Sequence, residues 1–176
     1  MKKLAILAIL LLAVSAMAQT DTATHRWYYG GGRIDYRPTA SWHATGGWAL
    51  PAGHNLWIIP GFDLGGFDSS GIRTSALDAQ ISWMPISGNI GAIHVFLEPG
   101  VDWVSTEASA DAYLTGAIGA MGLLKLSPFI KSSSPAGQWI ATHVGVWGAW
   151  KYKTNFQTAS AFPAGNSFGM GLAFKY

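Results

Sequence analysis

The last nine residues, Phe168-Gly169-Met170-Gly171-Leu172-Ala173-Phe174-Lys175-Tyr176, alternate strictly between two kinds of side chain. Every even-numbered position carries a large apolar or aromatic side chain, and every odd-numbered position carries glycine, alanine or lysine. A period of two residues is typical of a β-strand, because successive side chains of a strand point to opposite faces. The ending therefore predicts a strand with one apolar face and one small or charged face.

The same alternation recurs seven times upstream, with turn-forming residues between most of the segments. The segments preceding the terminal strand are 26–36, 39–50, 55–66, 71–85, 91–104, 113–131 and 138–153. Pro60 and Pro99 fall inside two of them, where each removes a backbone donor, so we expect a kink or bulge at both. The sequence thus predicts an all-β domain of eight strands.

The charged residues indicate which face of these strands meets which environment. Apart from Arg26 and Arg73 at strand ends, every charged strand residue lies on the face with the small side chains. The opposite face is uniformly apolar, and lipid is the environment that suits it. Backbone groups in lipid must all be hydrogen-bonded, so the strands have to close. We therefore predict an eight-stranded antiparallel up-and-down transmembrane β-barrel. A soluble periplasmic barrel with the apolar face inside remains an alternative.

Aromatic side chains gather towards the ends of the predicted strands on the apolar face. Membrane barrels carry such aromatic girdles at both lipid–water interfaces. The predicted girdle residues are Tyr36, Trp42, Trp48, Trp83, Trp103, Trp150, Tyr152 and Tyr176.

The N-terminus has the features of a secretory signal peptide. Met1-Lys2-Lys3 is basic, residues 4–14 are apolar, and Ala16-Met17-Ala18 is a small-x-small cleavage site. We predict a signal peptide over 1–18 and a barrel domain over 19–176. Cleavage would remove two lysines and leave nine basic and nine acidic residues. This balance argues against nucleic acid as a partner, because such binding depends on an excess of cations.

Composition supports the same class. The chain has 176 residues, of which 49% are hydrophobic and 11% charged, and it contains no cysteine. High hydrophobicity with few charges argues against disorder, and the lack of thiols excludes a disulfide-stapled scaffold.

The signal peptide, the eight segments and the terminal Phe168-x-Met170-x-Leu172-x-Phe174-x-Tyr176 pattern together resemble the small bacterial outer-membrane barrels of the OmpA, OmpX and OmpW type. The resemblance implies a location in the bacterial outer membrane, with both termini in the periplasm. It also implies contact with outer-membrane lipids and lipopolysaccharide, and a transient encounter of the terminal strand with the barrel assembly machinery.

Polar side chains are expected inside the barrel. Eight strands enclose a lumen that side chains largely fill. The predicted lumen network comprises Arg33, Asp35, Asp78, Gln80, Glu98, Asp102 and Lys151. Because buried charges require partners, we expect Arg33 to pair with Glu98 or Asp78. The lumen should be polar towards the outside and apolar towards the periplasm, and the ion pairs should plug it.

Three functions remain open at the level of sequence. A structural or surface-interaction role without catalysis is favoured. A lipid A-modifying enzyme would need a histidine and a serine at the outer rim, for which His43 and Asp68-Ser69 supply the residue types. A narrow channel is the third. The five histidines are scattered without His-x₃-His spacing, so no metal site and no cofactor are predicted.

Overall fold

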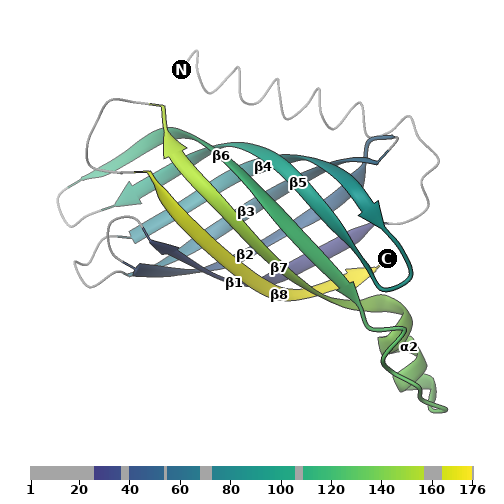
Figure 1. The fold of residues 1–176 in the computed structure, drawn as a ribbon. Helices are drawn as coiled ribbons and strands as arrows, with labels where there is room; N and C mark the ends of the chain where they lie inside the picture. The colour runs from purple at the N-terminus through teal and green to yellow at the C-terminus, as the bar shows by residue number, and fades with distance from the viewer. Residues whose placement is uncertain are drawn as a thin grey trace.

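The protein is described by a computed structural model that covers residues 26–36, 40–53, 55–67, 73–105, 109–156 and 164–175. These residues form eight strands and one helix (Figure 1). The elements are β1 (Trp27–Tyr36), β2 (Ala40–Pro51), β3 (Leu56–Phe67), β4 (Arg73–Ser87), β5 (Gly91–Ser105), β6 (Ala110–Lys125), α2 (Pro135–His143), β7 (Val144–Asn155) and β8 (Gly165–Lys175).

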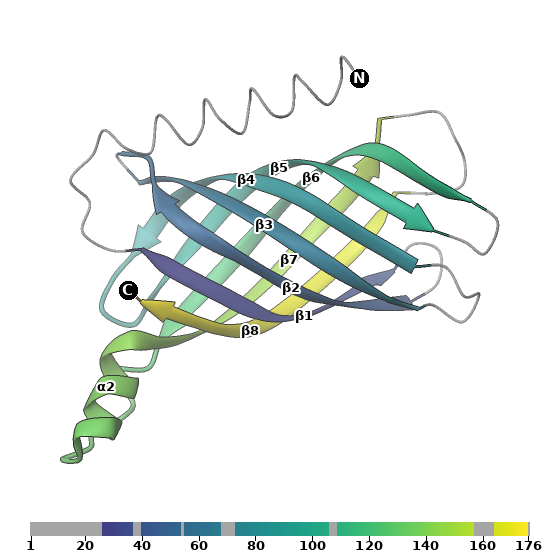
Figure 2. The ribbon, with the colours of Figure 1, turned by 180° about the vertical axis from the view of Figure 1, so that it is seen from behind.

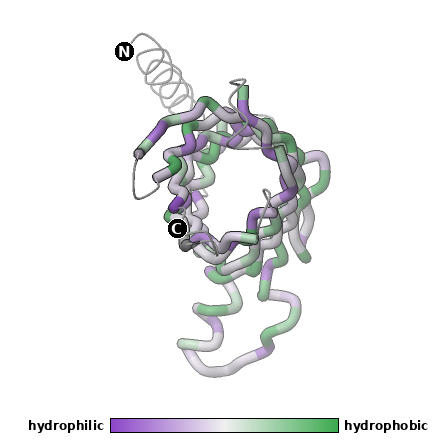
Figure 3. Tube along the Cα trace, turned by 90° about the vertical axis from the view of Figure 1, so that its left-hand side faces the viewer, coloured by the Kyte–Doolittle hydropathy of each residue, from purple (hydrophilic) through white to green (hydrophobic). Residues whose placement is uncertain are grey.

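Each strand pairs antiparallel with its neighbours in sequence, and β8 pairs with β1 to close the barrel. The strands run obliquely around the barrel in both side views (Figure 2), and the end-on view shows a closed ring (Figure 3). The predicted eight-stranded up-and-down barrel is therefore confirmed. Within the described residues, no helix has the length and apolar character that crossing a membrane requires.

The connection between β6 and β7 differs from the prediction. The sequence predicted strands over 113–131 and 138–153, but β6 ends at Lys125 and residues 135–143 form α2. This segment projects from the end of the barrel where the C-terminus lies (Figures 1 and 3). Trp139, which is exposed, and His143, which is half-buried, lie in α2 and not on a strand of the barrel.

Local signals explain why this helix begins where it does. The hydroxyl of Ser134 accepts a hydrogen bond from the backbone N–H of Gly137, at 3.1 Å. Pro135 follows at the first helical position, where its missing N–H costs nothing. Ser134 and Pro135 therefore form the start of a helix. The alternation of side chains at period two does not indicate this start.

Kinks or bulges were predicted at Pro60 and Pro99, but the pairing shows no register shift at either proline. The pairing of β2 with β3 passes over Pro60 and resumes in the same register. The pairing of β4 with β5 does the same opposite Pro99. Register shifts occur instead between Leu64 and Phe67 and between Trp83 and Ile86. The face assignment on either side of each proline is accordingly unchanged.

The faces of the barrel are inverted relative to a soluble protein. Leu97 in β5 is 58% exposed, whereas the next residue, Glu98, is 1% exposed. Of the predicted girdle residues, six have exposed side chains on the outer face: Tyr36, Trp42, Trp48, Trp83, Trp150 and Tyr152. Trp103 is half-buried, and Tyr176 lies outside the described residues. Their placement at a lipid interface stays a prediction.

Candidate functional site in the lumen

The lumen is divided along its axis into two layers of different chemistry. Strand β5 shows the division, because its inward side chains follow one another along the axis. His94 and Phe96 come first, at the end near α2, and Glu98 and Asp102 follow. A charged layer therefore lies beyond an apolar layer, in the order predicted.

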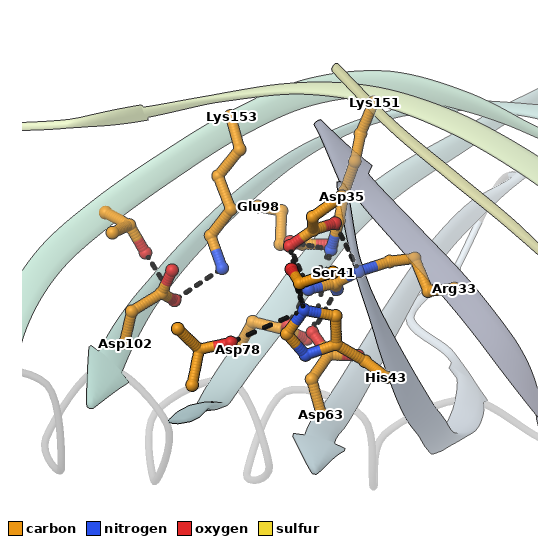
Figure 4. Close-up of polar contacts among 12 residues, drawn as sticks. Arg33, Asp35, Ser41, His43, Asp63, Asp78, Glu98, Asp102, Lys151 and Lys153 are labelled. Atoms are coloured by element: carbon orange, nitrogen blue, oxygen red, sulfur yellow. Dashed lines mark hydrogen bonds and ion pairs between the residues drawn. The ribbon is translucent and has the colours of Figure 1, made fainter. Parts of the chain in front are cut away.

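Arg33 anchors one part of the charged layer. Its guanidinium contacts Asp63 through Nη1, and its Nε lies 2.8 Å from Oδ1 of Asp35 (Figure 4). A second donor, Nη2, reaches Oδ2 of Asp35 at 3.0 Å. All three side chains are almost completely buried. A guanidinium that holds two carboxylates compensates part of the cost of removing its charge from water.

Lys151 in β7 connects the Arg33 contacts to Glu98 in β5, on the other side of the lumen. Its ammonium donates to Glu98, and it lies 3.9 Å from Asp78 and 4.0 Å from Asp63. Gln80 donates to the second oxygen of Glu98 at 2.9 Å. Side chains from strands on several sides of the barrel therefore meet in one ionic cluster.

A separate ion pair lies beside this cluster (Figure 4). Lys153 donates to Asp102, which also accepts a hydrogen bond from Thr115 at 3.1 Å. The side chain of Lys153 is fully buried. Lys153 was not among the predicted lumen residues, although it is the last residue of the predicted strand 138–153 and its parity with Lys151 places both on the same face.

The predicted partners of Arg33 were wrong, although all seven predicted network residues are buried inside the barrel. Arg33 pairs with Asp63 and Asp35, and Glu98 pairs with Lys151. Parity assigns a face to each residue, but the stagger between strands decides which inward residues share a level. That stagger brings β1 and β3 residues together across β2.

Little space remains within the charged layer. A cavity of about 30 Å³ lies among its side chains, lined in part by Arg33, Asp78 and Lys151. That volume holds roughly one or two water molecules.

His43 belongs to the charged layer, and the contacts described for it gather at one nitrogen of its ring. Oγ of Ser41 lies 3.0 Å from Nε2, and Oδ2 of Asp35 lies 3.5 Å from the same nitrogen. A triad places the nucleophile and the carboxylate at opposite nitrogens of the ring. Asp68 and Ser69, the other candidates for an enzyme site, lie outside the described residues. Among the described side chains, no group of three histidines or carboxylates is arranged to hold a metal ion.

The apolar layer contains a much larger cavity, of about 690 Å³. Its walls come from strands around the barrel and from the β6–β7 connection, including Ala141 and Thr142 of α2. Ile59 and Phe96 are buried and lie between the cavity and the charged layer, each two residues along its strand from a cavity residue, Trp57 or His94. Ile59 and Phe96 therefore pack at the boundary between the two layers.

Comparison with known proteins shows likeness in fold. No protein family and no curated protein matches the sequence. The N-terminal β-barrel domain of Pseudomonas aeruginosa OprF superposes with a TM-score of 0.55 at 8% identity, over 86% of this chain and 97% of that one. Neisserial surface protein A gives 0.54 at 7% identity, over 86% and 94%. Ail of Yersinia pestis gives 0.47 at 10% identity, over 86% and 97%. With its closed eight-stranded barrel, the chain has the fold of small bacterial outer-membrane barrels.

Proposed function

We propose that the protein is an outer-membrane barrel with a structural or surface-interaction role, and that its charged layer seals the lumen against ions. The observation that carries this proposal is the buried cluster of Arg33, Asp63, Lys151 and Glu98, beside which lies a cavity of about 30 Å³. An ion that entered this layer would have to displace paired charges, each of which would then be buried without compensation. By analogy with its structural neighbours, the end with α2 faces the periplasm.

One observation favours a narrow cation path as a second candidate. Among the described lumen residues, five carboxylates (Asp35, Asp63, Asp78, Glu98 and Asp102) meet three cationic side chains (Arg33, Lys151 and Lys153). A cleft with an excess of one charge concentrates ions of the other sign. A cation path would therefore use the carboxylates, and the sealed-lumen proposal has to be tested against it.

Planar bilayer recordings separate the two candidates. We expect the wild-type barrel to pass no steady current, and Lys151→Met, which increases the negative excess, to remain silent as well. Heat-modifiable migration of the re-extracted protein is the control for folded insertion. A steady, cation-selective current that grows in Lys151→Met would refute the sealed lumen and establish the channel.

An enzymatic role is not part of this proposal. The geometry of His43 gives no support to nucleophilic catalysis, because Ser41 and Asp35 approach one ring nitrogen. Incubation of the reconstituted protein with lipid A, followed by mass spectrometry, should show no gain or loss of acyl chains. A change in acyl number would establish the lipid-modifying alternative. We also propose that lipopolysaccharide and outer-membrane lipids surround the apolar face, and that the assembly machinery binds the terminal strand transiently.

A further inference from the structure

The apolar cavity at the α2 end is unlike the rest of the lumen. Its volume of about 690 Å³ falls within the ~300–1,000 Å³ of small-molecule sites, which are mostly apolar with a few polar groups. Its walls include Trp27, Tyr29, Trp57, Met84, Met121 and Trp147. Small barrels usually fill the lumen with side chains, so a large space bounded by aromatic residues indicates room for an apolar occupant.

The wall is held in place by specific contacts. The indole N–H of Trp147 donates to the carbonyl of Gly30 at 3.2 Å, and its ring meets the ring of Tyr29 edge to face at 5.5 Å. His94 is likewise fixed, since its Nδ1 lies 3.0 Å from the hydroxyl of Ser82. A site formed by immobilised side chains loses little entropy when it binds a ligand.

The charged side chains among the described residues that line the cavity have one sign. Lys125 and Lys175 both line it at strand ends on the α2 side. None of the described residues that line the cavity is an aspartate or a glutamate. Lys125 donates to the carbonyl of Gly88 at 2.7 Å, and an ammonium carries three donors. The mouth therefore favours an anion over a cation of the same shape.

We propose that this cavity binds a long-chain carboxylate, with its alkyl chain against Trp147 and Met121 and its carboxylate between Lys125 and Lys175. The packed Ile59 and Phe96 close the deep end, so the ligand enters and leaves by the α2 end. This site is separate from the charged layer and does not depend on the lumen being sealed.

The absence of cysteine from the chain permits a direct test. Met84→Cys places a single thiol in the cavity wall, and Ser133→Cys places one outside it as the control. Both variants are reconstituted as full barrels in phosphatidylcholine vesicles and labelled with N-ethylmaleimide in the presence of decanoate, decanol or decyltrimethylammonium. We expect decanoate to slow labelling of Met84→Cys several-fold at much lower concentration than the other two compounds, and to leave Ser133→Cys unaffected.

The lysines are tested in the same assay. Lys125→Gln combined with Lys175→Gln should raise the decanoate concentration for half-protection about three- to tenfold, as expected for the loss of two exposed charge contacts. Lys131→Gln, which removes a cation outside the cavity lining, should leave it unchanged. Equal protection by all three compounds, indifference to the lysine variants, or no protection of Met84→Cys would overturn the proposal.

Discussion

At the scale of the residue, the charged layer consists of side chains whose burial is tolerated only because they are paired. Loss of one member of a dry ion pair costs about 3–5 kcal/mol, because the remaining charge stays buried. Glu98→Gln removes the carboxylate that Lys151 contacts. We expect it to lower the free energy of unfolding in vesicles by about that amount, measured by urea titration with tryptophan fluorescence.

A double-mutant cycle identifies the partner. Lys151→Met with Glu98→Gln should show a strong coupling energy, because the two side chains are in contact. Arg33→Met with Glu98→Gln should show a weaker coupling energy, because Arg33 contacts Asp63 and Asp35 and is connected to Glu98 only through Lys151. Equal coupling in the two cycles would contradict the pairing described here.

The sequence predicted which residues face the lumen better than it predicted their contacts. Alternation at period two assigned Arg33, Glu98 and Lys151 to the inside, and each is buried there. The partner of Arg33 could not be obtained in this way, because it depends on the stagger of the closed sheet. Lys153 had the correct parity, although it was not among the predicted lumen residues.

At the scale of the element, the seam between β1 and β8 depends on glycine. A Cβ added to Gly31 would lie 2.1 Å from the carbonyl oxygen of Met170, and one added to Gly171 would lie 2.1 Å from that of Gly30. Gly31→Ala should therefore destabilise the barrel by about 1–3 kcal/mol, the range for overpacking. Gly30→Ala is the matched control, since its nearest contact would be an ordinary 3.8 Å. Equal unfolding midpoints for the two variants in urea would show that the seam is not tightly packed.

The outer face of the strands gives a second prediction at this scale. Leu97, in the middle of β5, and Ile90, in the turn before it, are both exposed apolar residues. Leu97→Lys should cost about 2–4 kcal/mol if this face meets the middle of the bilayer, whereas Ile90→Lys near the interface should cost about 0–1 kcal/mol. Urea titration in vesicles measures both, and comparable tolerance at the two positions would argue against the lipid-facing assignment.

The segment between β6 and β7 shows where alternation at period two does not predict a strand. Six of the predicted strands match the observed ones to within three residues at both ends, because such a strand alternates along its full length, whereas the two strands that flank α2 each differ by six residues at one end. Residues 126–143 contain apolar side chains at compatible spacing, yet Ser134 and Pro135 begin a helix there. Capping chemistry, which acts over three or four residues, decided the local structure.

At the scale of the whole molecule, a closed barrel should resist detergent until it is heated. We expect the protein to fractionate with outer membranes and to migrate differently on a gel before and after boiling, because every strand is paired on both sides. Recovery from the soluble periplasmic fraction without detergent would favour a soluble barrel instead.

If the apolar face of the barrel meets lipid and the charged face meets the lumen, two isoleucines should differ in their contact with lipid. Ile118 in β6 is 58% exposed on the outer face, whereas Ile59 in β3 is fully buried inside the barrel. Magnetisation transfer from lipid acyl-chain protons to methyl groups, measured by NMR on the protein in lipid nanodiscs, distinguishes the two positions without any substitution. We expect strong transfer to the Ile118 methyl groups and none above background to those of Ile59. Strong transfer to Ile59, or equal transfer to both, would contradict this assignment of the two faces.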